Sequence, residues 1–159
     1  MYKLLFVCTG NICRSPTAEG IMRELVQRAG LSGKVLVDSA GTSSYHNGDA
    51  PDIRSIKCAA KHGVNIINLR SRPLRAEDFA TFDVILAMDE KNVCDIENRR
   101  PFGDNRYNKA KVCKLLKYAP EYGTDVPDPY YGDNGFDVVY EMVETACENL
   151  LLELKHLFL

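Results

Sequence analysis

Short apolar runs alternate along the chain with longer segments whose apolar residues recur at helical spacing. The apolar runs predict four strands, over Lys3–Val7, Lys34–Asp38, Phe82–Met88 and Val112–Leu116. Helix signals predict helices over Ala18–Ala29 and Asp52–Lys61, a helix beginning at Asp89-Glu90, and a closing helix over Phe136–Leu157. Alternating strands and helices form parallel sheets with helices on both faces. The pattern therefore predicts an α/β fold in which ligands bind beyond the carboxyl ends of the strands.

The closing helix has the clearest periodic signal. Its apolar stripe consists of Val139, Met142, Val143, Ala146, Leu150, Leu154 and Leu157. The segment Arg99–Asn108 is polar and irregular instead, which indicates a surface loop. No repeat, low-complexity tract or linker interrupts the chain, so we expect residues 1–159 to form a single domain.

Composition and charge argue against several classes of function. Hydrophobic residues make up 45% of the chain and charged residues 26%, which is ordinary for a globular protein. The net charge of −2 gives no basic surface for nucleic acid. No apolar run approaches the roughly 18 residues that a membrane span needs. The N-terminal apolar segment is also too short for a secretory signal, so we expect a cytoplasmic protein.

The cysteines need a separate interpretation. There are six, at Cys8, Cys13, Cys58, Cys94, Cys113 and Cys147. An even number raises the possibility of a disulfide framework, but a chain of this length without a secretory signal favours free thiols. No cysteine or histidine pair has the spacing of a zinc site, so we expect no metal and no cofactor.

The stretch FVCTGNICRSPTAEG, from Phe6 to Gly20, combines a strand end, a tight loop and a helix start. Backbone N–H groups and the helix dipole converge at such a place and bind anions. Gly10 and Asn11 permit the backbone conformations that turn N–H groups inward. Cys8 lies near the helix N-terminus beside Arg14, an environment that favours the thiolate. Ser15 is a candidate hydrogen-bond donor to that thiolate.

The same cysteine-to-arginine spacing occurs a second time, from Cys94 to Arg100. This segment contains Asp95 and Glu97, whose charges repel an anion, and it has no glycine. It also falls within a predicted helix. We therefore interpret Cys94 as structural and Cys8 as the candidate nucleophile, the alternative for Cys8 being a core cysteine beside an incidental arginine.

The residues Val7 to Glu19 resemble the signature of the low-molecular-weight protein tyrosine phosphatases. The resemblance continues in Asp38-Ser39-Ala40-Gly41-Thr42, in Phe82-Asp83 through Met88-Asp89, and in Asp128-Pro129-Tyr130-Tyr131. It implies a three-layer α/β fold with a central parallel four-stranded sheet, helices on both faces and a phosphate-binding loop after the first strand. It also implies a metal-independent hydrolase that acts on phosphotyrosine and aryl phosphate monoesters through a phosphocysteine intermediate.

Several roles come with this resemblance. Cys8 would be the nucleophile, Arg14 the phosphate clamp and Asp128 the general acid. The expected phosphate- and substrate-binding residues are Thr9, Gly10, Asn11, Ile12, Cys13, Ser15, Tyr45 and Tyr130, and Ser39 would help to hold the loop. Expected partners are phosphotyrosine proteins or small aryl phosphates, with inorganic phosphate as product. Cys13 would protect an oxidised Cys8 by forming a reversible disulfide, the alternative being a small apolar residue packed under the loop.

Some assignments stay open at this stage. Taken alone, Pro127-Asp128-Pro129 is as compatible with a simple turn as with a general acid. His46 either tunes specificity or is merely solvated, and solvation is the favoured expectation. Met88-Asp89 is expected to end a strand and cap a helix, with at best a secondary effect on the site. The family's usual histidine is missing from Asn68–Arg72, where Asn68 is a possible substitute.

Three other functions fit the sequence less well than a tyrosine phosphatase. A thioredoxin-linked arsenate reductase needs two further relay cysteines, and only Cys94 lies in the right region. A protein arginine phosphatase tends to have threonine where Ile12 stands, so Ile12 favours a tyrosine substrate. A phosphopeptide-binding module would need the anion loop but neither the thiol nor the acid.

Overall fold

The computed structural model describes residues 1–132 and 134–158. Its parallel sheet consists of β1 (Tyr2–Cys8), β2 (Val35–Gly41), β3 (Val84–Ala87) and β4 (Lys111–Lys114), in the order β2-β1-β3-β4. The α-helices are α1 (Arg14–Arg28), α2 (Ile53–Lys61), α3 (Asp78–Thr81), α4 (Glu90–Glu97) and α5 (Phe136–Phe158). Short 3₁₀ helices follow β4: η1 (Leu115–Tyr118), η2 (Pro120–Tyr122) and η3 (Pro129–Tyr131).

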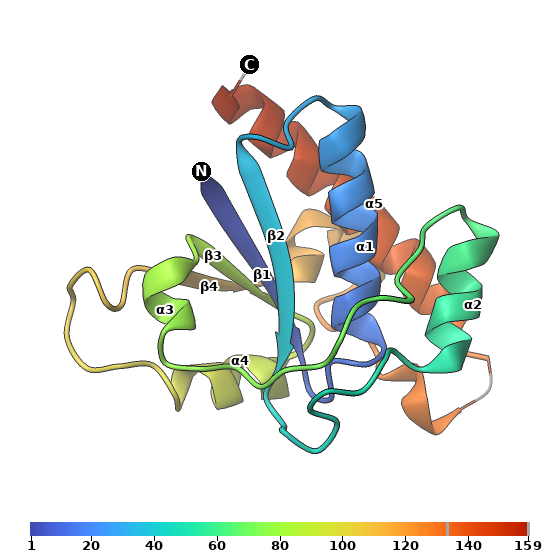
Figure 1. Cartoon of the computed structure of the whole chain (residues 1–159), viewed down its shortest axis with the longest axis horizontal. Coiled ribbons are helices and arrows are strands. Elements are labelled where there is room, and N and C mark those ends of the chain that lie inside the picture. Colours follow the sequence, from blue (N-terminus) through green and yellow to red (C-terminus); the bar gives the residue numbers. More distant parts are fainter. Residues whose placement is uncertain (133, 159) are drawn as a thin grey trace.

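The sheet is covered on both faces (Figure 1). Alternate residues of β1 point to opposite sides, as in any strand. Leu4 and Phe6 belong to the larger core cluster with residues of α1 and α5, and Leu5 and Val7 belong to a second cluster with Phe79 of α3. The predicted three-layer α/β fold is therefore confirmed.

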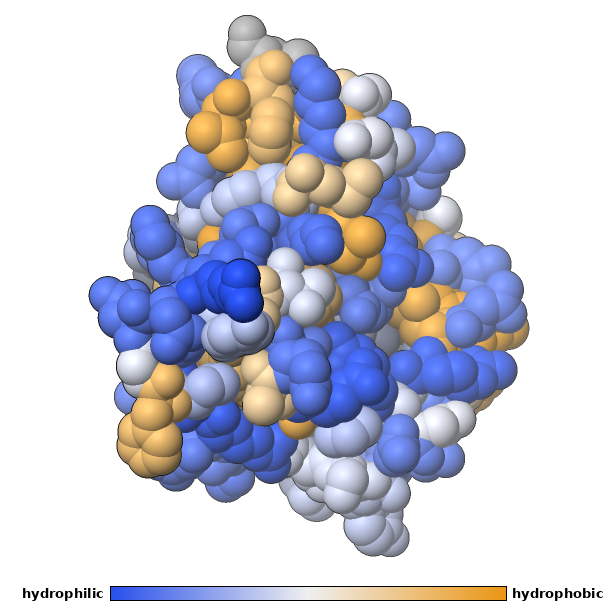
Figure 2. All heavy atoms as spheres, turned by 60° about the vertical axis from the view of Figure 1, so that its left-hand side comes forward, coloured by the Kyte–Doolittle hydropathy of each residue, from blue (hydrophilic) through white to orange (hydrophobic). Residues whose placement is uncertain are grey.

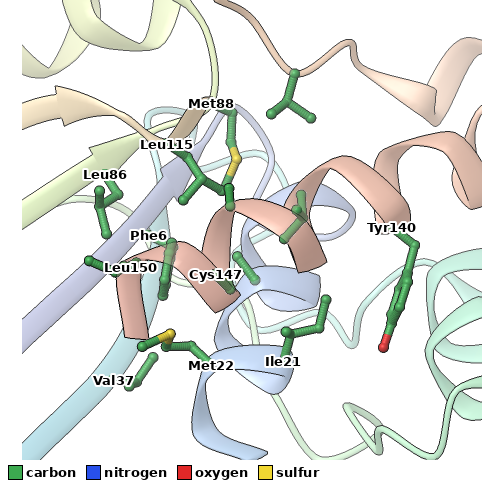
Figure 3. Packing of buried hydrophobic residues seen from close by; sticks show 14 of the residues in the cluster. Phe6, Ile21, Met22, Val37, Leu86, Met88, Leu115, Tyr140, Cys147 and Leu150 are labelled. Atoms are coloured by element: carbon green, nitrogen blue, oxygen red, sulfur yellow. The ribbon is translucent and has the colours of Figure 1, made fainter. Parts of the chain in front are cut away.

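The larger cluster fixes α1 and α5 against the sheet. In Figure 3, Phe6 and Val37 of the strands lie beside Met22 of α1 and Leu150 of α5. Phe6 and Met22 are completely buried. Because buried side chains of this size resist displacement, this packing gives the start of α1 a fixed position relative to the end of β1.

The order of the strands explains where a ligand can bind. The chain passes from β1 to β2 on one side and then to β3 on the other side of β1. The connections therefore diverge at the carboxyl end of β1, which is the point where open α/β sheets bind ligands. Cys8 is the last residue of β1.

Element boundaries differ from the sequence predictions in several places. Helix α1 begins at Arg14 rather than Ala18, and β2 continues to Gly41 rather than ending at Asp38. Strand β3 is shorter than predicted, and the predicted fourth strand changes into η1 at Leu115. The short helix α3 was missed. Its four residues are too few to produce a periodic signal.

The surface is mostly hydrophilic on the face shown in Figure 2, where apolar residues form separate spots. Leu157, which the sequence places in the buried stripe of α5, is 61% exposed, so that prediction is wrong at this position. Buried Tyr140, Cys147 and Leu151 complete the stripe instead. No helix within the described residues is long and apolar enough to span a membrane.

Candidate active site

The carbonyl groups of the Cys8–Arg14 loop are held by protein donors. The bonds run from Thr42 N to Cys8 O (2.9 Å), Ser43 N to Thr9 O (2.9 Å), Ser71 Oγ to Gly10 O (3.0 Å) and Asp52 N to Ile12 O (2.8 Å). A trans peptide points its N–H opposite to its C=O. The N–H groups that follow these carbonyls therefore face the other side of the loop.

The backbone N–H groups of the loop find no acceptor among residues 1–132 and 134–158: none from residue 10 to residue 14 donates to another protein group there. Asn11 adopts a φ of 57°, in the left-handed region that asparagine tolerates. Helix α1 begins at the end of the loop, so its dipole adds partial positive charge. The loop is an anion cradle.

Cys8 is 2% exposed at the base of this cradle. Its Sγ lies 3.0 Å from Oγ of Ser15. Asn11 Oδ1 accepts from the backbone N of Arg72 at 3.0 Å, so the Asn11 amide donates in the other direction. Its Nδ2 donates to Ser15 Oγ at 2.7 Å, which leaves the Ser15 proton available for Cys8.

The Asn11 side-chain amide is also connected, through Ser39, to the buried carboxyl group of Glu19. Asn11 Nδ2 also donates to Ser39 Oγ at 3.0 Å, and Ser39 Oγ donates to Glu19 Oε1 at 2.6 Å. Glu19 pairs with Arg23. Burial raises the pKa of Glu19, although the Ser39 hydrogen bond and the Arg23 charge oppose that shift. A continuous network of hydrogen bonds therefore braces the loop from behind.

Arg14 is 2% exposed and is held from two sides. Its Nη1 donates to Asp89 Oδ2 at 2.6 Å and to the carbonyl of Val126 at 2.9 Å. Burial opposes its charge, but Cys8, Asp89 and Asp128 outweigh burial and raise the pKa of Arg14. A planar guanidinium held in this way keeps its remaining donors fixed for an anion in the cradle.

The two oxygens of Asp128 have different partners. Oδ1 accepts from the backbone N of Tyr130 at 3.1 Å and thereby caps η3. Oδ2 lies 3.7 Å from Nη2 of Arg14, which is an ion-pair contact and too long for a hydrogen bond. One oxygen therefore makes the turn considered from the sequence, while the other faces the guanidinium.

A cavity of about 400 Å³ opens over the loop. It is lined by Cys8, Thr9, Gly10, Ile12, Cys13, Arg14, Ser43, Tyr45, His46, Asp128, Tyr130 and Tyr131. The structure thus brings together most of the predicted site residues, while Asn11 and Ser15 are buried behind the loop and brace it. Burial raises the pKa of Cys13 to about 12, so this thiol stays protonated at neutral pH.

Aromatic side chains form one side of the cavity. The His46 ring is 4.8 Å from the ring of Tyr45 and 6.2 Å from that of Tyr130, both in edge-on geometry. His46 also covers Gly10, where an added Cβ would lie 3.2 Å from its Cδ2. Its side chain is 22% exposed and pairs with Asp49. The expectation that His46 is merely solvated is therefore wrong.

Two further expectations need correction. Asp89 does cap α4, but it also makes the ion pair with Arg14, so its effect on the site is direct. Within the described residues, Ser71 and the backbone of Arg72 bond the loop, and Asn68 does not. Cys94 lies exposed in α4 and does not line this cavity. No cluster of three or more metal-ligating side chains occurs in the described part of the chain.

Comparison with known proteins identifies the family. Residues 3–157 match the family described as low molecular weight phosphotyrosine protein phosphatase. The chain belongs to this family. A rat phosphatase of that name is 44% identical over 149 residues, which cover 93% of this chain and 92% of the rat protein.

Solved structures of similar phosphatases agree with this assignment. A protein tyrosine phosphatase from Entamoeba histolytica, with Hepes in its active site, is 42% identical, with a TM-score of 0.89 and full coverage of both chains. A Drosophila arginine phosphatase is 35% identical, with a TM-score of 0.87, over 96% of this chain and 98% of that one. The fold therefore accommodates more than one phosphorylated side chain, and the substrate of this phosphatase depends on its own cavity.

Proposed function

We propose that this phosphatase hydrolyses phosphotyrosine monoesters with Cys8 as nucleophile, Arg14 as phosphate clamp and Asp128 as general acid. The observation that carries the proposal is that these three side chains line one cavity, over a loop whose N–H groups have no acceptor among the described residues. A phosphoryl group has three outer oxygens that need such donors, while the attacking and leaving atoms lie roughly in line.

In the first step the Cys8 thiolate attacks phosphorus. The P–S bond forms while the P–O bond to the tyrosine ring breaks, and Asp128 donates its proton to the departing phenolate oxygen. Phenol has a pKa of about 10, so protonating this leaving group accelerates departure by roughly 10²–10⁴-fold. Ser15 stabilises the thiolate beforehand through its hydroxyl, and Arg14 binds two phosphoryl oxygens.

In the second step water attacks the phosphocysteine. Asp128, now a carboxylate, takes a proton from the water, the P–O bond forms and the P–S bond breaks. The products are inorganic phosphate and the Cys8 thiolate, which the Ser15 hydroxyl again stabilises. The mechanism uses no cofactor and no metal.

The cavity favours aryl over alkyl substrates. Tyr45, His46 and Tyr130 present ring edges and faces that a phosphotyrosine ring can pack against. Ile12 contributes an apolar surface at the cradle, which suits a phenyl ring better than a charged guanidinium. We infer that substrates are phosphotyrosine proteins or small aryl phosphates.

The proposal also covers the cellular compartment of the enzyme and its domain organisation. A nucleophilic thiol needs reducing conditions, and the six cysteines are free in the structure, so we infer a cytoplasmic protein. We also infer that residues 1–159 act as one phosphatase domain, because the family match spans residues 3–157.

Two measurements test this function. Turnover of phosphotyrosine and phosphoarginine peptides, assayed at matched concentrations, is expected to favour phosphotyrosine strongly. Rapid quenching of the full chain with labelled aryl phosphate is expected to trap phosphate on Cys8, located by mass spectrometry. Equal rates on both peptides would contradict the substrate assignment, and label on another residue would contradict the nucleophile.

A further inference from the structure

The carbonyl of Gly10 differs from its neighbours in the kind of donor that holds it. Backbone N–H groups hold the carbonyls of Cys8, Thr9 and Ile12, whereas the hydroxyl of Ser71 holds that of Gly10. A backbone donor is present whatever the side chain, but a hydroxyl depends on the residue. The orientation of the Gly10–Asn11 peptide therefore depends on the identity of residue 71.

The two residues that flank this peptide tolerate several backbone conformations. Glycine precedes it, and Asn11 follows it with a φ of 57°. Rotation of a peptide unit changes ψ of the first residue and φ of the second, and glycine and asparagine both tolerate several such values. Without a hydrogen bond to its carbonyl, the peptide can turn its N–H away from the cavity.

Ser71 is itself held rigidly. It is 4% exposed, and its backbone exchanges hydrogen bonds with the loop that carries the aromatic side of the cavity: Gly48 N donates to Ser71 O at 2.8 Å, and Ser71 N donates to Asp49 O at 2.9 Å. The next residue, Arg72, is anchored by Asp78 and Asp38 through its guanidinium. The hydroxyl therefore has a fixed position behind Gly10.

We propose that Ser71 is a positioning residue of the phosphate site: its hydroxyl locks the Gly10–Asn11 peptide so that the Asn11 N–H points into the anion cradle. The inference rests on the proposed function of the loop as the phosphate site. Ser71 touches no substrate atom and acts through the Gly10 carbonyl alone. The N–H groups of Ile12 and Cys13 do not depend on it.

The test compares the full wild-type chain with Ser71→Ala, Ser71→Thr and Val35→Ala. Val35 is buried at the start of β2, at the opposite end of the sheet, and controls for loss of stability alone. Titration of ¹⁵N-labelled protein with inorganic phosphate reports each loop amide separately. For Ser71→Ala we expect phosphate binding and kcat each to fall about tenfold, less than the loss of a whole anion-stabilising donor.

The Asn11 amide is the diagnostic signal. Its phosphate-induced shift should shrink in Ser71→Ala while those of Ile12 and Cys13 persist, and Ser71→Thr should restore it because the hydroxyl returns. Wild-type phosphate affinity and an unchanged Asn11 shift in Ser71→Ala would overturn the inference, as would the same loss in Val35→Ala at equal stability. A wild-type chain that neither binds phosphate at this loop nor turns over aryl phosphate would overturn the proposed function itself.

Discussion

Asp89 Oδ2 lies 2.6 Å from Arg14 Nη1, although 75 residues separate the two in the sequence. The contact joins the N-terminal cap of α4 to the first residue of α1. Val126 N donates to the carbonyl of Met88, the residue before Asp89, so the segment that precedes Asp128 is held beside the same cap. Asp89 thus links the guanidinium to the end of β3 and to the segment that precedes Asp128.

Replacing Asp89 with asparagine separates its two functions. Asparagine is as good a helix cap as aspartate, so the start of α4 should stay intact. The charge beside Arg14 is lost, and the guanidinium is expected to move away from its clamping position. We expect kcat/KM to fall about 100-fold, as for small displacements in other active sites, and the melting temperature to fall as well, because the buried guanidinium loses a counter-ion that offsets its burial.

Asp89→Ala serves as the comparison, because it removes the cap as well and should cost about 1 kcal/mol more in stability. If Asp89→Asn keeps wild-type kcat/KM on an aryl phosphate, the ion pair contributes nothing to clamping.

Cys8→Ser is expected to abolish turnover and to preserve phosphate binding. The hydroxyl is a poor nucleophile at neutral pH, but the loop N–H groups and Arg14 remain in place. Cys94→Ser is the matched control, since Cys94 has the same spacing to Arg100 but lies exposed in α4. Steady-state assays and phosphate titration distinguish the two. Activity that survives in Cys8→Ser and disappears in Cys94→Ser would reverse the assignment.

The sequence predicted the cradle because its residues are contiguous. The end of a buried strand, Gly10, Arg14 and a helix start all occur within a few residues, so local rules were sufficient. The long-range contacts had no local signal. Ser71 meets Gly10 across 61 residues, and no periodicity places a hydroxyl there.

The errors in the predicted end of β2 and in the predicted role of Asp89 have a similar cause. The last residues of β2, Ser39 to Gly41, are small or polar and do not extend an apolar run, yet they are buried because β1 pairs with them. Asp89 was recognised as a cap from its neighbours. Its ion pair with Arg14 depends on β1 and β3 being neighbours in the sheet, and the sequence did not predict the order of the strands.

Asp128→Asn should slow poor leaving groups selectively. The amide oxygen can still accept from Tyr130 N and cap η3, so the loop should keep its shape, but no proton is available. We expect losses of roughly 10²–10⁴-fold in kcat/KM for phenyl phosphate and much smaller losses for esters of acidic phenols, because kcat/KM reports the step in which the leaving group departs. A plot of log kcat/KM against leaving-group pKa measures this slope. Equal losses for all esters would assign Asp128 a structural role only.

His46→Ala is expected to weaken binding of aryl substrates. Its ring packs edge-on against Tyr45 and Tyr130, and it covers Gly10. Losing such aromatic contacts should raise KM for phosphotyrosine by roughly two- to tenfold. Both kcat and the inhibition constant of inorganic phosphate should change little, since neither depends on the ring of the substrate. Phenylalanine at position 46 should restore KM, and a fall in kcat alone would indicate that His46 acts on the loop instead.

Oxidation of Cys8 is expected to end in a disulfide with Cys13, at a rate that depends on pH. Peroxide converts the Cys8 thiolate to a sulfenic acid, and the Cys13 thiolate then attacks that sulfur, forming the S–S bond and releasing hydroxide. Burial raises the pKa of Cys13 to about 12, so its thiolate fraction rises about tenfold per pH unit across the neutral range. Disulfide formation should accelerate accordingly between pH 6.5 and 8.5.

Mass spectrometry of peroxide-treated protein at each pH measures how fast the Cys8–Cys13 link forms. Cys13→Ser should keep catalysis but recover poorly with thiol reductants. Absence of a Cys8–Cys13 link, or equal recovery in Cys13→Ser, would show that Cys13 does not resolve the sulfenic acid, and a rate of link formation independent of pH would show that ionisation of Cys13 does not control the step.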